Sequence, residues 1–154
     1  MKTTLIFDLD DTVINPVATK ARYFENGDLD LVHYRANYTA RNVLKDKLLP
    51  LARVMKQAKK AGFRIVVLTA RDDRLNYAKN MLNFHGLNYD LFLSRELTDG
   101  KTFLNDGDYK AFLIAENNLI NGIMIDDNKI VKKALRKIGM VCLCAHKLNK
   151  RLKK

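Results

Sequence analysis

The sequence contains few of the residues that cross-link, kink or break a chain. It has no tryptophan, two cysteines, two prolines and seven glycines in 154 residues. Cys142 and Cys144 have no further cysteine and no histidine cluster nearby, so we expect core packing rather than a disulfide or a zinc site. No apolar run is long enough to cross a bilayer, and the N-terminus lacks a secretory leader. These absences predict a cytoplasmic protein with no membrane contact.

Acidic residues are also missing from the end of the chain. Residues 1–127 carry 18 basic and 17 acidic side chains, whereas residues 128–154 carry ten basic side chains and no acidic one. Nearly all of the net charge of +11 therefore lies near the C-terminus. This favours a polyanionic partner, nucleic acid first of all, although a solvated helix face and a disordered tail also account for it. We expect one domain over 1–146 and a basic tail over 147–154.

Apolar runs define the predicted sheet. Near-continuous apolar runs are typical of parallel strands that are covered on both faces. Five runs fit this description, at Thr3–Phe7, Phe63–Leu68, Leu91–Leu93, Ile123–Ile125 and Met140–Cys144.

Helical patterns alternate with these runs. Pro50 suits the first turn of a helix that ends before Gly62, and Asp72 or Asp73 is expected to cap a second helix that ends before Gly86. Alternating strands and helices predict an α/β fold, a doubly wound parallel sheet of about five strands.

Two further helices are predicted later in the chain. Asp108 is expected to cap the first of them, and Gly139 follows the second. The second helix should face the core with Ile130, Val131, Ala134, Leu135 and Ile138. Its other face should carry Lys129, Lys132, Lys133, Arg136 and Lys137 into solvent.

Residues suited to catalysis gather where predicted strands end. The first strand runs into Asp8-Leu9-Asp10-Asp11-Thr12, the second into Thr69-Ala70-Arg71, and the fourth into Asp126-Asp127. Ligand sites in such sheets lie at the carboxyl ends of the strands, so these groups should meet. Clustered carboxylates repel one another unless a cation holds them, which predicts a Mg²⁺ site.

These motifs, in this order and spacing, resemble those of the haloacid dehalogenase-like phosphatase superfamily over almost the whole chain. The resemblance implies a Rossmann-like core and hydrolysis of phosphate monoesters through an aspartyl-phosphate intermediate, with Mg²⁺ as cofactor. Only residues 14–48 separate the first motif from the first core helix, which implies a minimal cap or none. An open site of this kind would admit a large substrate, unless a partner acts as its lid.

The resemblance also implies roles for the first two motifs. Asp8 corresponds to the nucleophile that attacks phosphorus. Asp10 corresponds to the general acid that protonates the leaving group and then activates water, and Thr12 is expected to orient it. Thr69 corresponds to the hydroxyl that bonds the transferring phosphoryl oxygens.

The remaining roles fall to cations and to the late acids. Lys110, with Lys101 as the alternative, is expected to neutralise the phosphate. Arg71 is expected to bind the substrate phosphate or an adjacent one, the alternative being an exposed salt bridge to Asp72 or Asp73. The expected metal ligands are Asp8, Asp10 through its carbonyl oxygen, Asp127, and Asp126 in support.

Within the superfamily, residues 48–144 are most similar to the 3′-phosphatase domain of bacteriophage polynucleotide kinase-phosphatase. The likeness rests on Thr69-Ala70-Arg71 and on Ile125-Asp126-Asp127 followed by an amphipathic helix. The sequence lacks the Gly-x-x-x-x-Gly-Lys-Ser/Thr loop of a kinase, so no 5′-kinase activity is expected. The likeness implies removal of 3′-phosphates from nucleic-acid ends, as in DNA repair. Two alternatives remain, a phosphatase of small molecules such as nucleoside monophosphates and a non-catalytic nucleic-acid-binding or assembly subunit.

Residues 14–48 leave two questions open. The piece from Tyr23 to Asp28 is expected to close a small hairpin with Asn26-Gly27 as its turn. Tyr34 and Tyr38 either line the open site or only cover the sheet.

Overall fold

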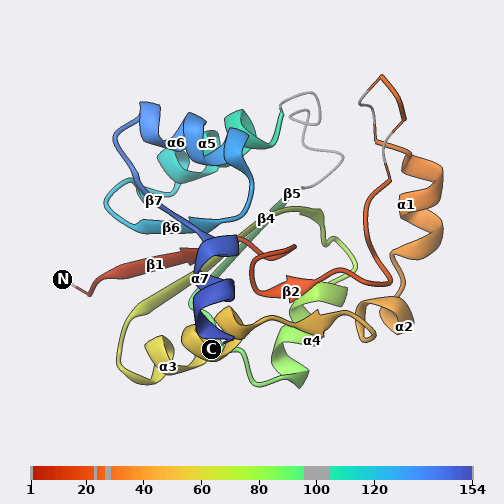
Figure 1. The fold of residues 1–154 in the computed structure, drawn as a ribbon, viewed down its shortest axis with the longest axis horizontal. Helices are drawn as coiled ribbons and strands as arrows, with labels where there is room; N and C mark the ends of the chain where they lie inside the picture. Colours follow the sequence, from red (N-terminus) through yellow and green to blue (C-terminus); the bar gives the residue numbers. More distant parts are fainter. Residues whose placement is uncertain (1, 23, 27–28, 96–104, 154) are drawn as a thin grey trace.

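The computed structural model describes residues 2–22, 24–26, 29–95 and 105–153 (Figure 1). Its central sheet has five parallel strands in the order β5-β4-β1-β6-β7. The strands are β1 (Thr4–Phe7), β4 (Arg64–Asp72), β5 (Leu91–Arg95), β6 (Ile123–Asp126) and β7 (Val141–Cys144). The five predicted strands and the α/β fold class are confirmed.

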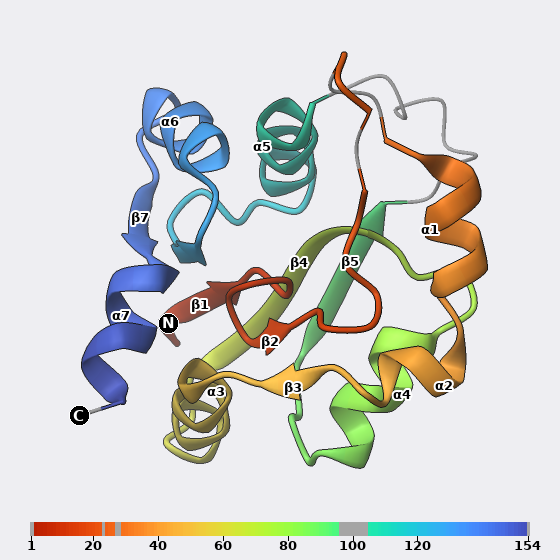
Figure 2. The same cartoon turned by 45° about the vertical axis from the view of Figure 1, so that its right-hand side comes forward.

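Helices cover both faces of this sheet, as Figures 1 and 2 show. One face carries α5 (Asp106–Glu116) and α6 (Lys129–Lys137). The other carries α3 (Pro50–Lys60), α4 (Tyr77–Phe84) and α7 (Ala145–Leu152). The sheet is therefore doubly wound, and its carboxyl-terminal edge is the expected place for a ligand.

Neighbouring residues of each central strand pack into different cores. Ile6 and Val66 belong to the cluster under α5 and α6, whereas Phe7 and Val67 belong to the cluster on the opposite face. All four side chains are fully buried. Since successive strand side chains point to opposite faces, a strand covered on both sides must be apolar throughout.

The predicted ends of two helices are confirmed. Pro50 is the first residue of α3. A helix makes no internal hydrogen bond to the N–H of its first residue, so a proline costs nothing at this position. Gly139 follows α6 with a φ of 84°, in the left-handed region that favours glycine.

The predicted starts of α4 and α5 are wrong by a few residues. Strand β4 continues to Asp72, so α4 begins only after Asn76, yet Asp73 still accepts a hydrogen bond of 2.7 Å from the N–H of Ala78. The N-cap of α5 is Asn105, whose side chain accepts from the N–H of Asp108 at 3.0 Å. The carboxylate of Asp73 therefore serves the first turn of α4 from outside the N-cap position, whereas Asp108 lies inside the first turn of α5.

The predicted orientation of α6 is also partly wrong. Ile130 is 65% exposed and Ile138 is 42% exposed, whereas Lys132 is buried. Its ammonium donates to the main-chain carbonyl of Asp126 at 3.1 Å and to that of Asp127. A long aliphatic stem can cross apolar surroundings when its charged end finds such partners, which periodicity alone does not reveal.

Residues 14–48 form a small cap rather than a second domain. Strands β2 (Ile14–Asn15) and β3 (Lys47–Leu48) pair antiparallel where the segment leaves and rejoins the core. Between them lie two short helices, α1 (Leu31–Asn37) and α2 (Ala40–Val43). The minimal cap is confirmed. The hairpin predicted over 23–28 lies outside the described residues, because 23, 27 and 28 are not among them.

The sequence analysis did not predict α7. Leu148 and Leu152 pack against the core, and the buried Asn149 accepts from the N–H of Leu51 and donates to the carbonyl of Thr12, each at 2.9 Å. The division of the chain at residue 146 stays a prediction, but most of the predicted tail is an ordered helix. None of the described helices is long and apolar enough to span a membrane.

Candidate active site

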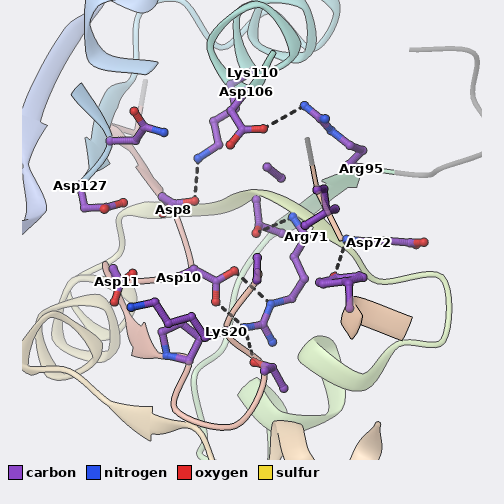
Figure 3. A pocket seen from close by; sticks show the side chains of 18 of the residues that line it. Asp8, Asp10, Asp11, Lys20, Arg71, Asp72, Arg95, Asp106, Lys110 and Asp127 are labelled. Carbon is purple, nitrogen blue, oxygen red and sulfur yellow. Dashed lines mark hydrogen bonds and ion pairs between the residues drawn. The ribbon is translucent and has the colours of Figure 1, made fainter. Parts of the chain in front are cut away.

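The three predicted strand ends meet at one cavity of about 630 Å³. Of the residues selected from the sequence, seven line it: Asp8, Asp10, Thr69, Arg71, Lys110, Asp126 and Asp127. Thr12 is fully buried beside them, and Lys101 lies outside the described residues. Figure 3 shows Lys110 reaching Asp8 from one side while Arg71 approaches Asp10 from the other.

A tight turn after β1 sends the neighbouring acids in different directions. The carbonyl of Leu9 accepts hydrogen bonds from the N–H groups of Thr12, Val13 and Ile14, at 2.9 to 3.3 Å. Asp11 takes a positive φ of 54°, in the left-handed region, where aspartate is tolerated better than most residues. This turn lets Asp8 and Asp10 face different partners.

Lys110 joins two buried carboxylates from adjacent strands. Its Nζ lies 2.6 Å from Asp8 Oδ1 and 2.7 Å from Asp126 Oδ2. All three residues are at most 5% exposed. The other oxygen of Asp8 accepts a 3.1 Å hydrogen bond from the hydroxyl of Thr12. Thr12 therefore holds Asp8, which corrects the expectation that it orients Asp10.

Burial and crowding shift the ionisation of this group. Burial raises the pKa of Asp8 well above its usual value, and Asp126 adds to the rise while Lys110 opposes it. Burial alone would lower the pKa of Lys110, but Asp8 and Asp126 raise it above its ordinary value. Burial and the neighbouring Asp126 also raise the pKa of Asp127. Burial and the mutual repulsion of the neighbouring carboxylates therefore disfavour the charged forms of Asp8 and Asp127.

The carboxylates of Asp8, Asp126 and Asp127 can converge on a cation. One ligand atom from each lies within 4.8 Å of the others. Carboxylate oxygens are the donors that Mg²⁺ prefers, so this part of the predicted ligand set fits the ion. The carboxylate of Asp10 is turned away from this group towards Arg71, and coordination through its carbonyl stays a prediction.

Arg71 is buried and grips Asp10 with two nitrogens. Its Nε lies 3.1 Å from Oδ2, and Nη2 bonds Oδ1. The same Nη2 lies 3.0 Å from the hydroxyl of Thr19 and 3.4 Å from Asp46. The alternative of an exposed salt bridge to a neighbouring acid is therefore wrong. Burial alone would lower the pKa of Arg71, but the charge and hydrogen bonds of Asp10 raise it above its ordinary value.

Thr19 and Asp46 are polar residues of the site that sequence reasoning missed. Both are buried, their side chains hydrogen-bond each other, and Asp46 also accepts from the N–H of Ala18 at 3.1 Å. They belong to no motif and lie far apart in the sequence. Only their joint burial against Arg71 identifies them.

Tyr34 of α1 and Tyr38, which caps the end of that helix, have different surroundings. Tyr34 lines the cavity, and its hydroxyl accepts from the N–H of Asp72 at 3.2 Å. Tyr38 is buried behind Arg71, with the guanidinium 5.2 Å from its ring centre, and donates to Asp73 at 2.6 Å. The rings stack with centres 5.3 Å apart. The sequence left open whether these tyrosines line the site or only cover the sheet. Tyr34 lines the site, whereas Tyr38 is part of the core that covers the sheet.

Arg95 and Asp106 complete the wall opposite α1 and were also missed. Arg95 Nη2 lies 3.2 Å from Asp106 Oδ1, and its guanidinium lies 4.4 Å from the ring centre of Tyr109. Both charged residues line the cavity. The sequence carried no signal for them beyond their nearness to Lys110.

A model of the family described as "Bacteriophage T5 5'-deoxynucleotidase" matches residues 1–154. No curated protein matches the chain.

Solved structures match the fold over most of the chain. A chain from the Pnkp1/Rnl/Hen1 RNA repair complex superposes with a TM-score of 0.67 and 25% identity, covering 93% of this chain and 42% of that one. A chain from a second structure of the Pnkp1/Rnl/Hen1 complex superposes with a TM-score of 0.71 and 23% identity, and the match covers 94% of this chain and 46% of that one. A haloacid dehalogenase-like family hydrolase from Streptococcus pneumoniae superposes with a TM-score of 0.66 and 16% identity, and the match covers 93% of this chain and 84% of that one.

The present chain spans less than half the length of the two RNA repair chains that it matches. The solved structures confirm the predicted fold. The family model confirms the predicted class of enzyme, a hydrolase of phosphate monoesters.

Proposed function

Because the chain belongs to the bacteriophage T5 5′-deoxynucleotidase family, we propose that its substrates are deoxynucleoside 5′-monophosphates. The reaction is hydrolysis of the 5′-phosphate ester, which gives a deoxynucleoside and phosphate. This proposal takes up the small-molecule alternative and refines it to one class of nucleotide.

The observation that carries the proposal is the cavity around Asp8. Its base holds Asp8, Asp10 and Lys110, and residues of the small cap, Tyr34 among them, form one wall. A volume of about 630 Å³ lies within the usual range for sites that hold one small ligand. The cap thus narrows the open site inferred from the sequence, and this favours a mononucleotide over a bulky substrate.

Asp8 and Asp10 are placed for two successive displacements at phosphorus. In the first, a carboxylate oxygen of Asp8 attacks phosphorus, the bond to the 5′-oxygen breaks, and Asp10 gives that oxygen its proton. In the second, Asp10 takes a proton from water, the water oxygen attacks phosphorus, and the bond to Asp8 breaks. In the structure Arg71 bonds both oxygens of Asp10, so one of these contacts must open before Asp10 can carry the proton, while the other keeps the carboxyl group in place.

Lys110 and Thr69 are proposed to bind the transferring phosphoryl group. Lys110 already contacts the nucleophile, so its charge lies where the phosphate oxygens must approach Asp8. Thr69 lines the cavity beside it and is buried. Mg²⁺, held by Asp8, Asp126 and Asp127, would supply the charge that brings an anionic substrate to an acidic site.

A second candidate is removal of 3′-phosphates from nucleic-acid ends. It is supported by the 25% identity to a chain of an RNA repair complex and by the basic residues after position 127. The chemistry at Asp8 would be the same, and only the group attached to the phosphate would differ.

Phosphate release from matched substrates tests the two candidates. The set is a deoxynucleoside 5′-monophosphate, its 3′-isomer, and one oligonucleotide that carries a phosphate at either end, each with Mg²⁺ or with EDTA. Asp8→Asn removes the nucleophile, and Asp108→Asn makes the same change at an exposed acid outside the cavity.

We expect metal-dependent release from the 5′-mononucleotide, lost by about 10⁴-fold or more in Asp8→Asn and retained in Asp108→Asn. Release only from the 3′-phosphorylated oligonucleotide would replace the first candidate with the second. Release that survives Asp8→Asn would contradict both.

A further inference from the structure

A second concave surface lies between α6 and α7, at the β7 edge of the sheet. Figure 2 shows the two helices on the same side of the molecule. The groove has a volume of about 770 Å³. Six cationic side chains line it: Lys129, Lys132, Arg136, Lys147, Lys150 and Lys153.

Neighbouring acidic side chains do not neutralise these cations through salt bridges. Within the described part of the chain, none of the six forms a salt bridge. Lys132 and Arg136 donate to main-chain carbonyls, which do not cancel their charge. Lys147, Lys150 and Lys153 are exposed. The groove therefore keeps a high positive charge that attracts an anion.

The groove adjoins the catalytic cavity. Asp11 and Asp127 line both. An anionic ligand that follows the groove would therefore pass beside the site where phosphate esters are hydrolysed.

We propose that this groove binds the phosphate backbone of a nucleic-acid strand and holds it beside the catalytic cavity. The inference goes beyond the proposed function, because a mononucleotide has a single phosphate and the catalytic cavity accommodates it. Cations spread along two helices, each spanning about 12 Å, match a ligand with several phosphates in a row.

An anionic membrane surface suits this region less well. Helices that lie on membranes insert a free apolar face between the lipids. The apolar residues of α7, Leu148 and Leu152, are packed against the core instead, and among the described residues of α6 Ile130 is the one large apolar side chain that is exposed. A concave groove also matches a strand better than a flat bilayer.

The test is binding of a fluorescent single-stranded oligonucleotide, followed by anisotropy between about 50 and 200 mM salt. The groove variant is Lys147→Glu with Lys150→Glu. The control is Lys56→Glu with Lys60→Glu, which changes the charge equally on exposed residues of α3 outside the groove.

We expect the groove variant to bind roughly tenfold more weakly than the control at the same salt. The slope of log Kd against log salt should fall by about 1.4, because each of the two lost phosphate contacts removes about 0.7. The control should bind like the unaltered chain.

Equal binding by the groove and control variants would overturn the proposal. So would binding of phosphatidylserine vesicles that depends on Lys147 and Lys150 while oligonucleotide binding is absent. The measurement uses no turnover, so groove-dependent binding by a chain that fails to hydrolyse nucleotides would contradict only the proposed function.

Discussion

Asp8 and Asp10 lie two residues apart, yet each depends on a different buried cation. Lys110 holds Asp8 and Asp126, which end two adjacent strands of the sheet. Arg71 holds Asp10, and the same guanidinium contacts Thr19 and Asp46 of the cap. One cation thus joins parts of the central sheet, and the other joins the catalytic turn to the cap.

The difference between the two networks lies in what each has to do. Lys110 offers a compact charge at the place where phosphate must meet Asp8, and a point charge suits that task. Arg71 has a planar fork that can hold one carboxylate in a fixed direction while it contacts others. Loss of Lys110 should therefore slow the chemical step most. Loss of the contacts of Arg71 should instead misplace Asp10 and loosen the attachment of the cap to the turn after β1.

Among changes to the residues that surround Asp8 and Asp10, the largest effect is expected from Lys110→Met, which breaks the first network. It leaves two buried carboxylates without their cation, so we expect turnover to fall by about 10²- to 10³-fold and the free energy of unfolding by about 3–5 kcal/mol. The measurements are kcat from phosphate release and unfolding in urea. Lys60→Met, at an exposed position on α3, is the matched control. Unchanged turnover in Lys110→Met would remove this lysine from the catalytic set.

A smaller effect is expected from Arg71→Lys, which keeps the charge but removes the fork. The lysine can satisfy only part of the contacts to Asp10 and Asp46, so Asp10 loses its fixed direction. Because small misplacements of a reacting group are costly, we expect kcat to fall by about 10- to 100-fold. The control is Arg74→Lys, which alters an exposed arginine paired with Asp72. Equal kcat values for both variants would show that the fork is not needed.

The same two networks show what the sequence could and could not predict. The place of Lys110 between two motifs led to a lysine that lines the cavity and contacts Asp8. The sheet was predicted because apolar runs and strand-end acids are local features. Asp46 and Asn149 were missed because their roles exist only through partners far along the chain. Lys132 was misplaced because its burial depends on carbonyl partners that no periodic pattern encodes.

Asp46→Asn sharpens the comparison by separating the two carboxylates that Arg71 contacts. The amide keeps the shape but loses the charge that faces Arg71 at 3.4 Å, while the contact between Arg71 and Asp10 remains. We expect a loss of about 1–3 kcal/mol in the free energy of unfolding and a rise in KM that exceeds the fall in kcat. Urea unfolding and steady-state kinetics measure both, with Asp108→Asn as control. A fall in kcat with unchanged KM would place Asp46 with the catalytic chemistry instead of the cap.

The smallest effect is expected at an ion pair outside both networks, between Lys59 and Asp90. The hydrogen bond from Lys59, with one from the N–H of Ile65, lowers the pKa of Asp90. A lowered folded-state pKa means that the charged form stabilises the fold above the ordinary aspartate pKa and that this contribution fades as the pH falls towards the folded value. The pair is exposed, so Asp90→Asn should cost under about 1 kcal/mol at neutral pH and less still at high salt. Thermal unfolding from about pH 6 down to about pH 2.5, across the ordinary aspartate pKa and below it, would show the difference between variant and unaltered chain shrinking, and a difference that grew on acidification would reverse the sign of this argument.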